Sequence, residues 1–121
     1  MTRSPDSLAP LVGSWTLIAL DGEPLPVVGR SPTIAFREDG AVSGTGGVNR
    51  IMTRLAKDDV AQGRIAFAPA ATTRMAGPPE AMDLERVYLD HLDAISTFVV
   101  DGATLRLFAR AHEALTFERA E

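Results

Sequence analysis

The segment Gly40-Ala41-Val42-Ser43-Gly44-Thr45-Gly46-Gly47-Val48-Asn49-Arg50 decides the fold class of this chain of 121 residues. It contains four glycines and the chain's only asparagine. It follows an Asp39-Gly40 turn signal and leads into the strand-like run from Val48 to Leu55 rather than into a helix. Glycines in this setting allow positive φ angles or a close approach of two backbones, and Asn49 suits a left-handed conformation or hydrogen bonds to nearby amides. We therefore interpret the segment as a corner in a β-protein.

Phosphate binding is the alternative interpretation of this glycine loop. A P-loop requires Gly-Lys-Ser/Thr at the start of a helix, whereas this chain has Gly46-Gly47-Val48-Asn49. A dinucleotide-binding loop requires a strand before it, a helix after it and an acidic residue for the ribose. Neither context occurs here, so the structural interpretation is favoured and we predict no cofactor.

The composition indicates one globular domain. Hydrophobic residues make up 45% of the chain, and a chain of this length buries about two-thirds of its surface on folding. The net charge of −4 and the lack of a basic run argue against a nucleic-acid partner. The chain has no cysteine, which excludes disulfides, thiolate metal sites and thiol catalysis. We expect a flexible lead-in over residues 1–10 and a single monomeric domain over residues 11–118.

Alternating apolar residues separated by turn signals predict a mainly β chain. Strands are expected at residues 14–20, 33–37, 41–43, 48–55, 64–67, 72–75, 95–100, 104–108 and 114–118, with a polar turn at 57–63. Asp101-Gly102 is a strong signal for a two-residue hairpin. Short strands at this spacing are typical of sandwiches and barrels, so we predict a curved antiparallel sheet of about seven to nine strands in one of these two forms.

One helix is expected at about residues 79–93. Apolar residues recur there at spacings of three and four, Pro79 suits the first turn, and Glu80, Asp83 and Glu85 complement the positive end of the helix. The predicted core consists of the larger apolar residues of these elements: Trp15, Leu17, Ile34, Phe36, Ile51, Phe67, Leu84, Tyr88, Leu92, Phe98, Leu105, Leu107, Leu115 and Phe117.

Few residues suggest chemistry. We expect Trp15, at the start of the first strand, to plug one end of the barrel. We favour the interpretation of Thr72-Thr73-Arg74-Met75 as a strand with one exposed arginine. The alternative interpretation is that Arg74 faces an anionic ligand. His91 and His112 have no candidate nucleophile nearby in the sequence, so we predict neither a catalytic site nor a metal site.

Taken together, these features resemble the META/HslJ family over about Leu11 to Phe117. The landmarks lie in order along the chain: Trp15, Leu20, Gly22, Phe36, Gly40, Gly44, Gly47-Val48-Asn49-Arg50, Thr72-Thr73-Arg74-Met75-Ala76-Gly77, Glu85, Tyr88, Leu89, Leu92, Leu105, Leu107, Leu115 and Phe117. The resemblance marks Trp15, Gly44, Gly47, Asn49, Thr72, Thr73, Arg74 and Met75 as family-motif residues, with a structural role or a role in binding.

Two departures from the family pattern concern cysteine. Relatives commonly have cysteine where Val48 and Gly77 stand in this chain. We hypothesise that these cysteines pair or pack together in the relatives. Val48 and Gly77 should then be neighbours in this protein.

The family resemblance implies a small barrel-like sheet with a helix packed on it and no established enzymatic activity. Relatives include envelope and heat-inducible proteins, so we expect a non-enzymatic, stress- or envelope-related domain that binds a protein partner or an apolar ligand. The alternative is a lipocalin-like carrier of a lipid or small molecule in a barrel cavity. No transmembrane segment is evident, and we expect a periplasmic or envelope location if a leader was removed and a cytoplasmic one otherwise.

Overall fold

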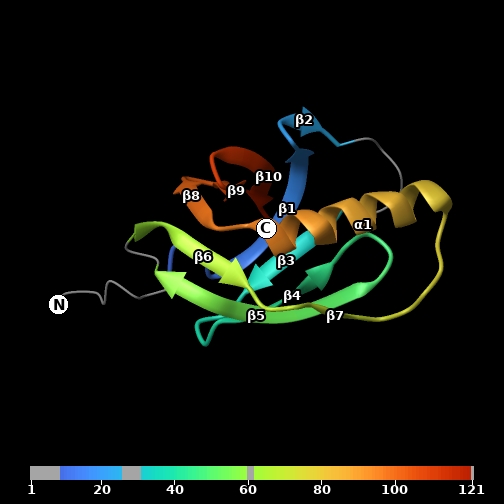
Figure 1. The fold of residues 1–121 in the computed structure, drawn as a ribbon, viewed down its shortest axis with the longest axis horizontal. Helices are drawn as coiled ribbons and strands as arrows, with labels where there is room; N and C mark the ends of the chain where they lie inside the picture. The colour runs from blue at the N-terminus through green and yellow to red at the C-terminus, as the bar shows by residue number, and fades with distance from the viewer. Residues whose placement is uncertain (1–8, 26–30, 60–61, 121) are drawn as a thin grey trace.

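A computed structural model describes residues 9–25, 31–59 and 62–120 of the chain (Figure 1). Ten strands and one helix occur among these residues. In chain order they are β1 (Gly13–Leu20), β2 (Glu23–Pro24), β3 (Thr33–Phe36), β4 (Ala41–Thr45), β5 (Arg50–Asp59), β6 (Arg64–Phe67), β7 (Ala71–Thr72), α1 (Pro79–Ala94), β8 (Thr97–Asp101), β9 (Thr104–Ala109) and β10 (His112–Arg119). Most of the expected lead-in, residues 1–8, lies outside the described residues.

The strands form one antiparallel sheet that curves into a ring. Nine of the strands follow the order β10-β9-β8-β6-β5-β4-β3-β1-β2, and β7 pairs with β5 beside this path. Strand β10 also pairs with β1, which brings the two ends of the sheet together. The ring is weakest between β6 and β8, where Arg64 and Thr97 are the one pair of partners. The predicted barrel-like antiparallel sheet with a single helix is confirmed.

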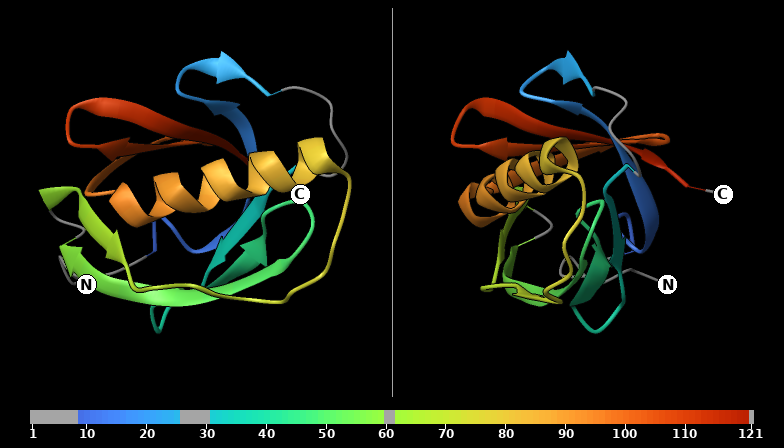
Figure 2. Two further views of the ribbon diagram at one scale, coloured as in Figure 1. Left: turned by 45° about the vertical axis from the view of Figure 1, so that its right-hand side comes forward. Right: turned by 90° about the vertical axis from the view of Figure 1, so that its right-hand side faces the viewer.

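Helix α1 lies along the concave side of the sheet, beside the place where β6 and β8 diverge (Figure 2). Its buried residues are Ala81, Glu85, Tyr88 and Leu92, which recur at spacings of three and four and so share one face. The prediction that Leu84 belongs to the core is wrong, because Leu84 is only partly buried and Glu85 faces inward instead.

Several boundaries differ from the sequence prediction. The expected turn over residues 57–63 begins later, because β5 continues to Asp59 and pairs with β6 through a register shift after Leu55. In the segment 72–75 only Thr72 belongs to a strand. The hairpin between β8 and β9 turns at Gly102 and Ala103, since Asp101 still pairs with Thr104.

The core fills the space between the sheet and α1. All predicted core residues except Leu84 are buried. Tyr88 and Phe117 meet edge to face, with 6.2 Å between ring centroids. Burial raises the pKa of Tyr88, whose hydroxyl has no hydrogen-bond partner among the described residues. Within the same residues, no helix has the length and apolarity needed to cross a membrane.

Trp15 belongs to the core, as predicted, and lies near the start of β1. Its side chain is fully buried, and its Nε1–H donates a hydrogen bond of 2.9 Å to the carbonyl oxygen of Leu11. The guanidinium of Arg119 lies over the ring, 4.0 Å from the centroid, and donates hydrogen bonds to the carbonyl oxygens of Val12 and Pro10. Trp15 therefore fixes the start of β1 against the end of β10.

We predict that Trp15→Ala lowers the free energy of unfolding by about 3–5 kcal/mol, because it removes a large buried side chain and leaves a cavity. Urea denaturation measures the change. Ile18→Ala is the matched control on the same strand, since Ile18 is 41% exposed, and it should cost less than about 1 kcal/mol. A similarly small loss for Trp15→Ala would show that the indole is peripheral to the fold.

Candidate functional site

The glycine loop and the segment 72–77 meet at Asn49, which is 5% exposed. Its Oδ1 accepts hydrogen bonds from the Met75 backbone N–H at 2.6 Å and from the Thr73 hydroxyl at 2.9 Å. Its carbonyl oxygen accepts hydrogen bonds from the Thr45 hydroxyl and from the Gly46 N–H. The side chain of Asn49 thus joins two segments that are distant in sequence.

The carboxylate of Glu85 holds the same loop against α1. Glu85 Oε2 accepts the backbone N–H of Val48 at 2.9 Å and that of Asn49 at 2.6 Å, and Oε1 accepts the Asn49 Nδ2 amide at 2.7 Å. Burial of a charged carboxylate is costly unless donors surround it, and these three donors meet that requirement. The interpretation of Glu85 as part of an acidic helix start is therefore wrong.

Small residues are required where the loop approaches its neighbours. A Cβ atom at Gly44 would overlap the backbone of Thr33, and one at Gly46 would overlap the side chain of Glu85. Gly47 has a φ of 111°, which residues with a side chain rarely adopt. The predicted corner in a β-protein is thus found, and Gly46 leaves room for the buried carboxylate.

The other motif residues lie outside this network or at its edge. Thr72, Arg74 and Met75 have exposed side chains, and Arg74 makes no side-chain hydrogen bond or ion pair with the described residues. Trp15 belongs to the other side of the sheet's ring, on β1. Of the motif residues predicted from the sequence, the structure joins Asn49, Thr73 and the backbone of Met75.

Val48 and Gly77 are neighbours, as hypothesised. A Cβ atom built on Gly77 would lie 3.7 Å from the Cβ of Val48, and 3.0 and 3.1 Å from its methyl carbons. Disulfides join Cβ atoms that are about 3.5–4.5 Å apart. The two positions therefore have the geometry for a disulfide, and Val48 fills that space in this chain.

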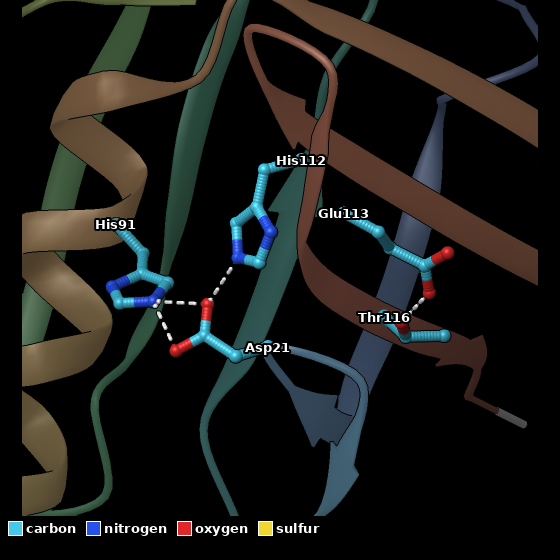
Figure 3. Close-up of polar contacts among 5 residues, drawn as sticks. All are labelled: Asp21, His91, His112, Glu113 and Thr116. Atoms are coloured by element: carbon cyan, nitrogen blue, oxygen red, sulfur yellow. Dashed lines mark hydrogen bonds and ion pairs between the residues drawn. The ribbon is translucent and has the colours of Figure 1, made fainter.

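A second cluster joins the chain's two histidines to Asp21 (Figure 3). Nε2 of His91, on α1, lies 2.9 and 3.0 Å from the two carboxylate oxygens, and Nε2 of His112, at the start of β10, lies 2.7 Å from Oδ1. An ionised carboxylate only accepts hydrogen bonds, so both Nε2 atoms carry a proton in this arrangement. The cluster connects the turn after β1 to α1 and to β10.

The electrostatics of this cluster favour a charged Asp21. The hydrogen bond from His112 is the largest influence and lowers the pKa of the Asp21 carboxyl. Desolvation opposes it by raising this pKa, and the interaction with His91 lowers the pKa further. In the described part of the chain, no group of three or more acidic or histidine side chains is placed to hold a metal ion. Sequence reasoning missed the cluster because its histidines lie 70 and 91 residues from Asp21.

A groove of about 330 Å³ separates α1 from the chain around the end of β6. Its lining is mostly apolar, with acidic side chains from the helix: Thr53, Phe67, Ala68, Pro69, Ala70, Thr72, Leu89, Asp90, Leu92 and Asp93. By contrast, the polar atoms of Asn49 and Glu85 are already occupied by intramolecular partners. The groove is therefore one candidate surface for a ligand.

We predict that Glu85→Gln lowers the free energy of unfolding by about 2–4 kcal/mol, because the amide NH₂ of glutamine would face buried N–H donors. Chemical denaturation measures the loss. Glu80→Gln, an exposed change on the same helix, should shift stability by no more than about 0.5 kcal/mol. Equal effects from the two variants would contradict a structural role for the Glu85 carboxylate.

The double change Val48→Cys with Gly77→Cys should form a disulfide and stabilise the oxidised protein by about 3 kcal/mol, because the crosslink restricts the unfolded chain. Thiol titration and denaturation with and without reductant provide the measurement. Two thiols that stay free under oxidising conditions would refute the proposed geometry.

Asp21→Asn should cost at most about 1 kcal/mol at pH 7, because the carboxylate is partly exposed and screened by solvent. Asparagine tolerates the positive φ of residue 21, so the change isolates the charge. A lowered carboxyl pKa stabilises the fold above the unfolded-state pKa of about 3.9, and this stability is lost as the pH falls through the folded-state pKa. Denaturation from about pH 5 down to about pH 2 should show the two proteins converging below about pH 4, and a difference that stays constant over this range would contradict the assignment.

Comparisons with known proteins identify the family. The META domain family model matches residues 7–121. One protein solved by NMR has 20% sequence identity to this chain and a TM-score of 0.67, and the match covers 98% of this chain and 96% of that protein. An NMR structure of a protein from Burkholderia xenovorans has 25% sequence identity and a TM-score of 0.66, and the match covers 99% of this chain and 94% of that protein. A crystal structure of a DUF4847 family protein from Bacteroides vulgatus has 15% sequence identity and a TM-score of 0.64, and the match covers 91% of this chain and 94% of that protein. No curated protein matches the sequence. The chain belongs to the META domain family.

Proposed function

We propose that this META domain is a non-enzymatic module that binds another protein through its outer surface. The observation that carries the proposal is the close packing between α1 and the sheet among the residues that the structure describes. The space enclosed by residues such as Ile34, Val42, Ile51, Tyr88 and Leu92 leaves no room for a water molecule. A lipocalin-like carrier requires an internal cavity for its ligand, so the filled core favours a protein partner over an enclosed lipid.

Helix α1 is the reason for the filled interior. Tyr88 and Leu92 project from it into the concave side of the sheet, where a lipocalin would hold its ligand. Three hydrogen bonds to Glu85 hold the helix in place. An internal ligand would have to displace this helix and leave a buried carboxylate without donors, which is energetically unfavourable.

The polar clusters support a structural rather than a catalytic assignment. Asn49 and Glu85 satisfy each other and the adjoining backbone, and Asp21 is engaged by both histidines. Following the resemblance to envelope and heat-inducible relatives, we place the proposed binding role in an envelope- or stress-related process.

The first test is native mass spectrometry of the purified protein, followed by organic extraction. We expect the ligand-free mass of the chain, because the interior is packed. A stoichiometric lipid or other apolar molecule would contradict the proposal and favour the carrier alternative.

The second test is site-specific photo-crosslinking in the organism that produces the protein. Benzoyl-phenylalanine is placed at Leu89 in the groove, and at exposed Met52, Met75 and Val99 elsewhere on the surface. We expect a discrete protein adduct from at least one position, which an excess of the unlabelled domain suppresses. No competable adduct from any of the four positions would contradict a protein-binding role.

A further inference from the structure

The groove between α1 and the end of β6 carries charge of one sign. Its floor is formed by Phe67 and Leu92, which are 8% and 4% exposed, with partly buried Leu89 beside them. Among the residues that line it, Asp90 and Asp93 are the ones that carry a charge. The groove thus combines an apolar floor with two carboxylates and no lining cation.

The two carboxylates are placed where they weaken the helix. Asp93 lies in the last turn of α1 and Asp90 directly precedes that turn, where the negative end of the helix dipole disfavours anions. They are also like charges three residues apart on one helix, which repel each other. Arg86, the nearest cation in the helix sequence, pairs with Asp83 instead. Both aspartates are exposed and neither has an ion pair with a described residue, so their charges are accessible to a partner.

We propose that this groove binds a short extended segment of a partner protein that carries a lysine or arginine beside apolar residues. The apolar side chains would cover Phe67, Leu89 and Leu92, while the cation lies between Asp90 and Asp93. A cation there would also relieve the repulsion between these two carboxylates. This inference rests on the proposed protein-binding function and specifies the surface and the chemistry of the partner.

The test uses a phage library of random ten-residue peptides selected against the immobilised domain. We expect the enriched peptides to contain lysine or arginine next to apolar residues. Their amide shift changes in ¹H–¹⁵N spectra should centre on residues 67–70 and 89–93. Binding should weaken as the salt concentration rises, because the contacts between charges are partly exposed to solvent.

The decisive variant is Asp90→Asn with Asp93→Asn, which keeps the shape of the groove and removes its charge. It should weaken binding of the selected peptides by about five- to tenfold, as expected for two partly exposed ion pairs. Glu80→Gln with Glu118→Gln is the matched control, since it removes two exposed charges outside the groove lining and should leave binding unchanged.

Each contrary outcome has a distinct meaning. Peptides that bind another surface, or that bind the Asp90/Asp93 variant as well as the wild type, would overturn this inference and leave the proposed function standing. If no selected peptide binds, this inference is contradicted, whereas the proposed protein-binding function is decided by the photo-crosslinking experiment. The Asp90/Asp93 variant should melt at a temperature equal to or above that of the wild type, and a lower melting temperature would show that the carboxylates serve the fold, which also overturns the inference.

Discussion

A buried carboxylate on α1 determines how the helix and the sheet fit together. Glu85 is 5% exposed and accepts hydrogen bonds from three N–H groups of Val48 and Asn49. Its charge would be costly to bury without them, so the loop before β5 and the helix are tied to each other's position. The rotation of α1 follows from this contact, because turning Glu85 inward leaves Leu84 partly exposed and directs Tyr88 and Leu92 into the core.

Asn49 extends the same constraint to a third segment. Its amide nitrogen donates to Glu85 while its amide oxygen accepts from Thr73 and Met75. The segment that leads into α1 is thereby fixed, although only Ala71 and Thr72 of it form a strand. Gly46 provides the space for the carboxylate. The side of α1 that borders the end of β6 carries the groove residues Leu89, Asp90 and Asp93.

Local patterns in the sequence were sufficient for most of the architecture. The spacing of apolar residues predicted the position of the helix, and their alternation between turn signals predicted the positions of most strands. Both kinds of pattern involve residues that are close together in the sequence. The loop at residues 40–50 was correctly read as a backbone corner from its glycines and Asn49. Glu85 was misinterpreted as part of an acidic helix start that complements the helix dipole, and only its buried donors, distant in sequence, reverse that expectation. The same limit applies to Asp21, whose partners are 70 and 91 residues away.

Native-state hydrogen exchange at the Val48 and Asn49 amides tests the role of Glu85 most directly. If these N–H groups are held by a buried carboxylate, they should exchange only when the whole domain unfolds, as slowly as amides in the middle of β9 and β10. Exchange at Asn49 as fast as at the exposed residue Ala76 would show that the loop opens independently of the fold. The contact with Glu85 would then not be the constraint that positions α1.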